Sequence, residues 1–242
     1  MTNTDLNIGK AAKYLGVSID TLRRWDKSGK LPAKRSEGGH RYYSQTDLEL
    51  FQEDTLALAS KWILGPAKEP EGSLYCPTSS EFKGRLSKLQ SALEKMPDLT
   101  EYYPLIVAIV GEIGNNSFDH NLGNWPDISG VYFSYDTNKR QIALADRGQG
   151  VLRTLKRVKP NIKNDGDALH IAFTEVISGR APEARGNGLK FVLEVVLSKP
   201  IDLEFYSGAA KVSVKNSTVE AKKMEVSKTD LYYSGCLVLI RF

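Results

Sequence analysis

The sequence predicts an α+β fold divided into two units, and three observations support this prediction. The length of 242 residues exceeds one small domain but suits a unit of about 50 residues followed by one of about 140. Two short helical patterns lie near the N-terminus, whereas β runs and longer helical patterns follow later. Between them, residues 65–77 have the Pro, Gly and charge content of a linker. We expect a small unit at 1–52, a linker at 53–80 and a larger unit at 81–242.

The small unit is expected to begin with two short helices. Ile8–Leu15 is amphipathic, and Gly16-Val17 forms a turn after it. Ser18 is a good N-cap for a second helix, which carries Arg23 and Arg24. Two helices about a turn apart, the second with adjacent arginines, suit a helix laid in the major groove of DNA.

The segment after these helices reads KLPAKRSEGGHRYYSQTDLELF. Together, residues 6–52 resemble the MerR-type winged helix-turn-helix, most closely the excisionase-associated version with its KLP…GGHRRY signature. The resemblance implies that the second helix faces bases and phosphates and that the wing grips the DNA backbone. The residues implied in DNA binding are Thr21, Arg23, Arg24, His40, Arg41 and Tyr43. Tyr42 stands where the family has a second arginine.

Several of these side chains also have a plainer interpretation. Arg23 and Arg24 would otherwise form a solvated helix face, and His40 a solvated wing tip. For Trp25 we favour a core position that closes the helix pair over a contact with DNA.

The charge distribution fits a DNA partner. Residues 1–52 hold nine Lys or Arg against six Asp or Glu, and the net charge of the whole chain is +4. Because phosphate neutralisation sets much of the affinity for DNA, this modest excess predicts weak binding by one copy. Pairing of two chains as a homodimer, or an array of several DNA sites, is therefore expected.

A leading helix of the larger unit is expected at 81–96. Its apolar residues repeat with 4-3-4 spacing at Phe82, Leu86, Leu89 and Leu93. Such a stripe forms either a dimer seam or a packing face against the rest of the larger unit. About two heptads are short for a free coiled coil.

The next helical pattern ends in EIGNNSFDHN, at Glu112–Asn121. At about 100° per residue, Glu112, Asn116 and Asp119 fall on one face, with His120 beside it. This face has a candidate base and an amide ligand where a core would be apolar. The plainer interpretation is a helix that emerges into solvent.

Two further motifs follow β and helical patterns. The β runs Val131–Tyr135 and Gln141–Ala145 are joined by a hairpin turn and lead into DRGQG at 146–150. An aspartate at a strand end accepts a hydrogen bond from the exocyclic amine that adenine has and guanine lacks at that position. Later, RGNGL at 185–189 opens an apolar run, and a Gly-rich helix start presents N–H groups to phosphates.

In this order the three motifs resemble the ATP-binding domain of the GHKL superfamily, over residues 100–242. That group includes gyrase-type ATPases, sensor histidine kinases and anti-sigma serine kinases. The resemblance implies a two-layer α/β sandwich of the Bergerat type that binds ATP with Mg²⁺. The implied site residues are Glu112 as general base, Asn116 as metal ligand, Asp146 on the adenine amine, Gly148 and Gly150 along the pocket, and Gly186 and Gly188 on the phosphates. Some members use a lysine of a following domain at the γ-phosphate, and here we expect Arg185 to substitute for it, with Arg180 and Lys190 as alternatives.

Two details refine this resemblance. Gly235-Cys236 stands where many members have Gly-Thr before the last strand. The sequence pattern ExxxNxxxH, which ends at His120, is most similar to that of the anti-sigma serine kinase branch. No histidine lies in 81–103, so an autophosphorylating histidine kinase is not expected.

The function predicted from the sequence is a DNA-binding regulatory protein with a nucleotide-dependent switch and slow ATP hydrolysis. The alternatives are a serine protein kinase acting on a protein partner, a DNA-tethered ATPase, and a scaffold that binds no nucleotide. Cys76 and Cys236 make no metal spacing, and three histidines give no zinc cluster. The polar N-terminus and the short apolar runs predict a cytoplasmic protein without a membrane span.

Overall fold

The computed structural model describes residues 5–52, 55–70, 72–176, 188–216 and 223–242. The chain divides into two compact units, Met1–Leu58 and Ala59–Phe242. Helices and antiparallel strands build both units, in agreement with the expected α+β class.

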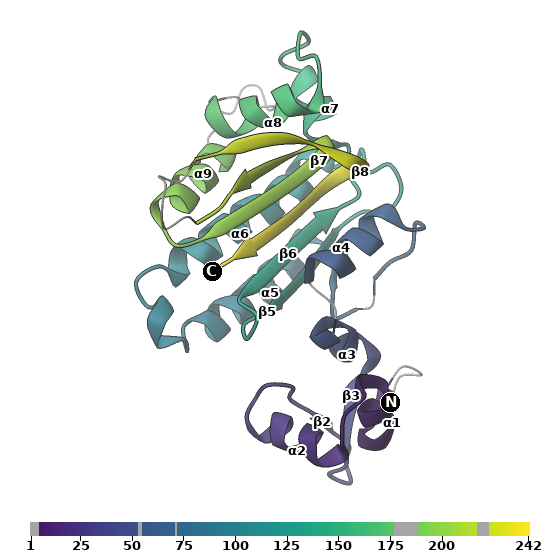
Figure 1. Cartoon of the computed structure of the whole chain (residues 1–242). Helices are drawn as coiled ribbons and strands as arrows, with labels where there is room; N and C mark the ends of the chain where they lie inside the picture. The colour runs from purple at the N-terminus through teal and green to yellow at the C-terminus, as the bar shows by residue number, and fades with distance from the viewer. Residues whose placement is uncertain (1–4, 53–54, 71, 177–187, 217–222) are drawn as a thin grey trace. The chain divides into compact units, whose positions relative to one another are not determined.

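The first unit is a small helical domain with a three-stranded antiparallel sheet of order β1-β3-β2. Its elements before the boundary helix are β1 (Asp5–Asn7), α1 (Ile8–Leu15), α2 (Ile19–Lys27), β2 (Lys34–Arg35), β3 (Arg41–Ser44) and α3 (Gln45–Gln52) (Figure 1). The expected bounds of α1 are confirmed. The Ser18 side chain accepts from the Thr21 backbone N–H, which confirms the expected N-cap of α2.

Local backbone chemistry explains why two helices form so close together. Asn7 caps α1 by accepting from the N–H of Lys10. Gly16 ends α1 with a φ of 66°, in the left-handed region that favours glycine. The helix pair then encloses a core with Ala12 and Leu22, both buried.

The second unit has a five-stranded antiparallel sheet of order β4-β5-β6-β8-β7. Its described elements, with the boundary helix first, are α4 (Thr55–Leu64), β4 (Tyr75–Cys76), α5 (Ser79–Leu93), a 3-10 turn (Pro97–Leu99), α6 (Tyr103–Asn121), β5 (Val131–Asp136), β6 (Gln141–Asp146), α7 (Gly150–Lys156), α8 (Asp165–Thr174), α9 (Gly188–Ser198), β7 (Asp202–Val214) and β8 (Glu225–Arg241). The expected strands at 131–135 and 141–145 are confirmed, each with one residue more.

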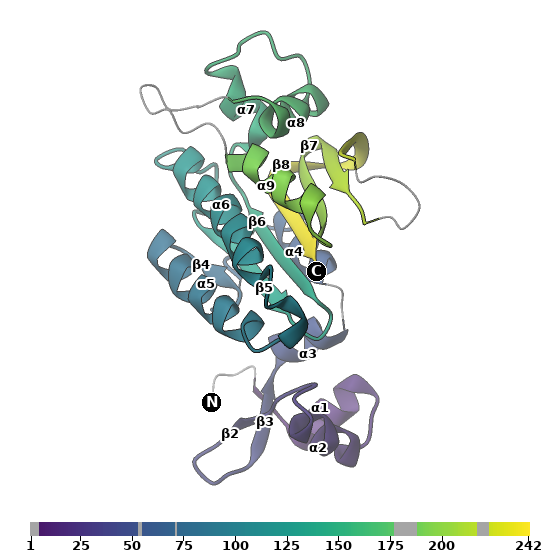
Figure 2. The ribbon, with the colours of Figure 1, turned by 90° about the vertical axis from the view of Figure 1, so that its left-hand side faces the viewer.

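Helices α5, α6 and α9 cover one face of this sheet (Figures 1 and 2). The two faces of β5 show the arrangement. Phe133 packs on Phe82 of α5, with ring centroids 5.3 Å apart. Its neighbour Tyr132 points the other way and stacks on Trp62 of α4 at 5.8 Å. The second half of α4 therefore lies on the face opposite α5.

The expectation that the region before the larger unit is only a linker is corrected. The interval 53–80 contains α4 and β4 rather than only a linker, because Ala59 and Ile63 are apolar and buried and Cys76 pairs in register with Val131. Their signals were short and flanked by Pro, Gly and charged residues. The composition of residues 53–80 therefore did not predict the helix and the strand that they contain.

The apolar stripe of the leading helix packs inside its own unit. Phe82, Leu89 and Leu93 are fully buried in the main core, and Leu86 packs against it. The dimer-seam alternative is therefore wrong for this stripe, since its residues are already covered.

Within the described residues, no helix is both long enough and apolar enough to cross a membrane.

Candidate functional site

The candidate site centres on Asp146, the last residue of β6. Its side chain is buried, with 2% of the residue exposed. Ser117 on α6 donates its hydroxyl to Asp146 Oδ2 at 2.8 Å, and the Gly148 backbone N–H donates to Oδ1 at 2.9 Å. The carboxylate is thus held between the end of a strand and the last turns of a helix.

Burial raises the pKa of Asp146 to about 6, against the opposing effect of the hydrogen bonds from Ser117 and Gly148. At neutral pH the carboxyl group is mainly ionised. It then acts as a hydrogen-bond acceptor inside the protein.

A second polar contact fixes the loop after β6. Asn121 donates its amide to the carbonyl of Ser117 at 2.8 Å, and its Oδ1 accepts from the Gln149 N–H at 2.8 Å. Sequence reasoning missed both Ser117 and Asn121. Their signal was a pair of polar residues four apart, on a different helix face from Glu112 and Asn116.

The glycines of this loop are explained in part by packing. A Cβ at Gly148 would lie 2.1 Å from Asn121 Nδ2, and a Cβ at Gly235 would lie 2.0 Å from the Asp146 carbonyl oxygen. Gly150 has a φ of 73°, where a side chain is strained. The expected ligand-shaping role of Gly148 and Gly150 stays a prediction beside these structural roles.

The structure brings Glu112 and Gly188 together. A Cβ at Gly188 would lie 1.9 Å from Glu112 Oε1, so the start of α9 adjoins the middle of α6. Glu112 and Asn116 are both half-buried and one helical turn apart. The helix α6 therefore connects the Asp146 site to the glycine at the start of α9.

Arg185 and Gly186 lie outside the described residues. A hollow of 450 Å³ borders the loop at Gly148 and Gly150, but Glu112, Asn116 and Asp146 do not line it. The described residues contain no cluster of three or more His, Cys, Asp or Glu suited to hold a metal.

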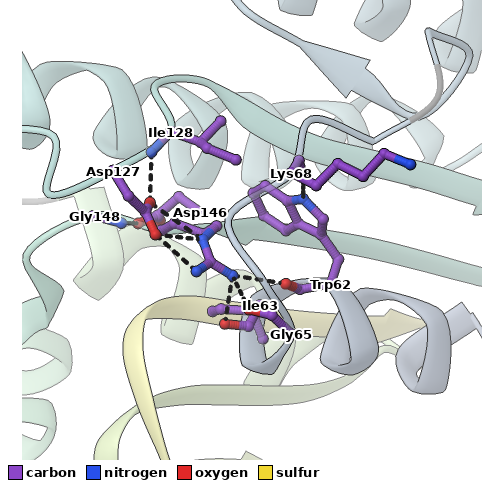
Figure 3. A network of polar contacts seen from close by, with 9 residues as sticks. Trp62, Ile63, Gly65, Lys68, Asp127, Ile128, Asp146 and Gly148 are labelled. Carbon is purple, nitrogen blue, oxygen red and sulfur yellow. Dashed lines mark hydrogen bonds and ion pairs between the residues drawn. The ribbon is translucent and has the colours of Figure 1, made fainter.

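Arg147, between Asp146 and Gly148, is another residue that the sequence did not single out. Its guanidinium forms an ion pair with Asp127 and donates to the carbonyls of Trp62, Ile63 and Gly65 at the end of α4 (Figure 3). The pKa of Asp127 is lowered, chiefly by the hydrogen bond from Arg147. These acceptors lie 82 to 85 residues earlier in the chain, so no local pattern identifies the contact.

In the first unit, α2 presents two of the expected DNA-binding residues outward. Arg23 and Arg24 are exposed, and Arg23 pairs with Asp20 at 2.9 Å. Thr21 is half-buried, and its hydroxyl lies 2.9 Å from Ser18 Oγ. Their expected roles remain predictions.

The wing is tied to α2 through Asp26. One carboxylate oxygen, Oδ2, accepts from Arg41 Nε and from Arg35 Nη2, each at 2.7 Å, and Oδ1 accepts from the Ala33 N–H at 2.8 Å. The Ala33 N–H and the Arg41 guanidinium lower the pKa of Asp26. His40, at the wing, is exposed.

The expected DNA contact of Tyr43 is corrected. Tyr43 is fully buried, and its hydroxyl donates to the Leu22 carbonyl oxygen at 3.5 Å. Successive side chains of a strand point to opposite faces, so Tyr42 is the partly exposed neighbour. The expected core position of Trp25 is confirmed by its packing against that core and by its 4.9 Å ring contact with Phe51.

Comparison with known families bears on the first unit. Residues 7–43, which include α1, α2 and most of the wing, match the family model described as MerR family regulatory protein. The N-terminal unit contains a MerR-type helix-turn-helix domain. The match does not extend to the residues of the second unit.

Three curated relatives share parts of the chain. The HTH-type transcriptional activator TipA of Streptomyces coelicolor is 42% identical over 100 residues, which are 37% of this chain and 40% of TipA. The chromosome-anchoring protein RacA of Bacillus licheniformis is 42% identical over 48 residues, 20% of this chain and 26% of RacA. The type II methyltransferase M.Eco47II of Escherichia coli is 36% identical over 63 residues, 26% of this chain and 15% of that enzyme. The chain therefore spans less than half the length of each of these relatives.

Proposed function

We propose that this chain is a DNA-binding regulatory protein whose second unit binds Mg-ATP and acts as a nucleotide-dependent switch. The observation that carries the nucleotide part is the buried carboxylate of Asp146 at the end of β6. The MerR-type domain carries the DNA part.

The chemistry of Asp146 suits the recognition of adenine. The carboxylate accepts from the Ser117 hydroxyl and the Gly148 N–H, and Cys236 also hydrogen-bonds to it through its backbone and its side chain. An ionised carboxylate is an acceptor only, so it attracts the amine that adenine offers, whereas it repels the carbonyl oxygen that guanine offers. We expect selectivity for ATP over GTP.

The donor set on α6 suits a nucleotide-bound Mg²⁺. Magnesium keeps several waters and takes few protein ligands when phosphates supply the rest, so one amide oxygen from Asn116 is enough. The ion supplies positive charge to the phosphates when it is bound. Glu112, one turn earlier and beside Gly188, orients a water and accepts its proton in slow hydrolysis.

Phosphate binding is assigned to the start of α9. Gly188 lets the helix start approach Glu112 without a side chain between them. Arg185 and Gly186, just before it, belong to the same proposed phosphate site. The five-stranded antiparallel sheet with helices α5, α6 and α9 on one face supports a GHKL-type architecture.

The proposed DNA surface is made of the exposed residues of α2 and the wing. Arg23, Arg24 and His40 are exposed, and Arg41 is half-buried with its Nε held by Asp26. TipA is described as a transcriptional activator, and we extend a regulatory role in transcription to this chain. Two chains paired as a homodimer provide the affinity that one small basic surface lacks.

A calorimetric titration tests the nucleotide part. Mg-ATP is expected to bind the full chain, Mg-GTP is expected not to bind, and Asp146→Asn is expected to lose ATP binding. Asp230→Asn removes the same charge from an exposed position and serves as the matched control. No heat with either nucleotide, at protein concentrations that detect micromolar affinity, would leave a DNA-binding scaffold.

A DNA-tethered ATPase is the second candidate. The contact between Glu112 and Gly188 favours it, because it places a candidate base beside the proposed phosphate site. Steady hydrolysis that is lost in Glu112→Gln with ATP binding retained, together with a DNA affinity that ATP does not change, distinguishes this ATPase from the proposed switch.

A further inference from the structure

We propose that Arg147 couples nucleotide occupancy at Asp146 to the end of helix α4. This inference rests on the proposed function, since it needs a nucleotide at Asp146. It adds a residue, Arg147, through which that site regulates α4, the helix that follows the MerR-type domain in the chain.

Arg147 closes the C-terminal end of α4. Its Nη1 donates to the carbonyl oxygens of Trp62, Ile63 and Gly65, at 2.8, 3.0 and 3.1 Å. The last carbonyls of a helix have no partner within the helix, and a cation there also complements the helix dipole. The guanidinium therefore supplies the cap of α4 from a distant part of the sequence.

The other side of the guanidinium is hydrogen-bonded to Asp127. Its Nη2 donates to Asp127 Oδ2 at 2.7 Å, and its Nε donates to the same oxygen at 2.9 Å. The residue is only 8% exposed. A planar guanidinium with fixed acceptors on both sides has one position that satisfies all of them.

Aromatic packing holds the end of α4 at the same place. The Trp62 ring lies 5.8 Å from Arg147 Cζ and stacks on Tyr132 of the sheet. Its indole N–H donates to the Lys68 carbonyl oxygen at 2.9 Å (Figure 3). The end of α4 and the segment after it thus pack around one arginine.

The backbone of Arg147 belongs to the candidate nucleotide loop. Asp146 precedes it, and Gly148, whose N–H donates to Asp146 Oδ1, follows it. Any shift of this tripeptide on adenine binding moves the Cα of Arg147. Because buried contacts are closely packed, the guanidinium transmits that shift to the end of α4.

The coupling is reciprocal by linkage, and its direction is part of the proposal. A ligand shifts an equilibrium only by its differential affinity for two states, and the effect is reciprocal. We assign higher ATP affinity to the state in which Arg147 caps α4. ATP then stabilises the last turn of α4, and loss of the cap weakens ATP binding.

Hydrogen exchange of the full chain, read by mass spectrometry with and without Mg-ATP, tests this coupling. Peptides that cover residues 59–66 are expected to exchange at least about fivefold more slowly with Mg-ATP, the lower end of typical coupling factors. In Arg147→Lys the charge stays, but one ammonium cannot satisfy all these acceptors. There we expect ATP to bind with reduced affinity and without the effect on 59–66.

The matched control is Arg140→Lys, because Arg140 is a surface arginine of the same β5–β6 hairpin that pairs with Asp98. It is expected to behave as wild type in both measurements. A purely structural cap would make 59–66 exchange faster in Arg147→Lys, yet leave the response to ATP intact.

Each outcome decides the proposal. ATP binding by calorimetry with no change at 59–66 in the wild type overturns the coupling and leaves the proposed function standing. An equal response to ATP in Arg147→Lys overturns the role of Arg147. No ATP binding overturns the proposed function and the coupling with it. If Arg147→Lys fails to fold, Asp127→Asn, which removes the ion-pair partner of Arg147, takes its place: a weaker response of 59–66 to Mg-ATP supports the role of Arg147, and a full response overturns it.

Discussion

The Ser117 hydroxyl on α6 donates a hydrogen bond of 2.8 Å to Asp146 Oδ2 at the end of β6, and both residues are buried. A hydroxyl that donates to a carboxylate favours its ionised form. Ser117 therefore keeps Asp146 available as an acceptor despite its burial.

Ser117→Ala is expected to raise the pKa of Asp146 further above about 6, because it removes a donor to the charged form. Since the proposed adenine contact needs the carboxylate, ATP affinity should fall at lower pH and recover as the pH rises. The pH at which half of the affinity is lost should be higher in Ser117→Ala than in wild type. Ser87→Ala, on the exposed side of α5, is the control; identical pH profiles for Ser117→Ala and wild type would falsify this role.

Asp146 should also make stability depend on pH. Its pKa is raised from 3.8 to about 6 in the folded chain, so the folded state binds more protons between these values. Stability is then lost as the pH rises from about 4 to 6, by roughly 3 kcal/mol for a shift of about two units. Asp146→Asn should lack this loss and be the more stable protein at pH 7.

Urea unfolding at several pH values checks this prediction. In a Trp25→Phe background, Trp62 and Trp125 report on the second unit by fluorescence. The free energy of unfolding of Asp146→Asn, relative to its parent, should increase between pH 4 and pH 7. A difference that stays constant with pH contradicts the raised pKa.

Gly188→Ala should affect hydrolysis more than nucleotide affinity. The added Cβ would meet Glu112 Oε1 at 1.9 Å, and the flexible end of that side chain can move aside. A displaced general base costs on the order of 100-fold in rate, whereas the adenine contact at Asp146 is untouched. Turnover and calorimetry on the same samples separate the two quantities, and unchanged turnover would remove Glu112 from its proposed role.

Asp26→Asn should weaken DNA binding, although it removes a negative charge from a basic domain. Asp26 holds the guanidinium groups of Arg35 and Arg41 in place, and we expect that orientation to be needed for phosphate contacts. Fluorescence anisotropy with a generic DNA duplex at low salt measures the effect. We expect about a tenfold loss of affinity, equivalent to roughly 1.4 kcal/mol.

Asp20→Asn is the matched control for Asp26, since it neutralises an exposed acid on the same helix. General electrostatics predicts unchanged or tighter DNA binding for that variant. Tighter binding by Asp26→Asn as well would mean that Asp26 acts only through its charge.

Local signals in the sequence were sufficient for many elements. Ser18 and Gly16 specify the helix ends by their own backbone preferences, and two β runs joined by a short turn predicted the hairpin of β5 and β6. These features depend on residues within a few positions of one another. They could therefore be predicted without the fold.

The errors concern features that only the fold decides. Tyr43 was assigned to the DNA surface because it lies in the wing signature, but the pairing of β3 with β1 turns it inward. Ser117 was missed because its partner Asp146 is 29 residues away, and Arg147 because its partners are 20 to 85 residues away. The spacing of Ser117 and Asn121 marks a polar helix face, but only the packing of the fold decides which residues that face meets.

The most direct test of the nucleotide-dependent switch is DNA affinity measured with and without saturating Mg-ATP. Anisotropy on one duplex, at one salt concentration, gives both values for the wild type and for Asp146→Asn. The proposed switch predicts a change of about fivefold or more in the wild type and none in the variant. Equal DNA affinity with and without bound ATP in the wild type would contradict it.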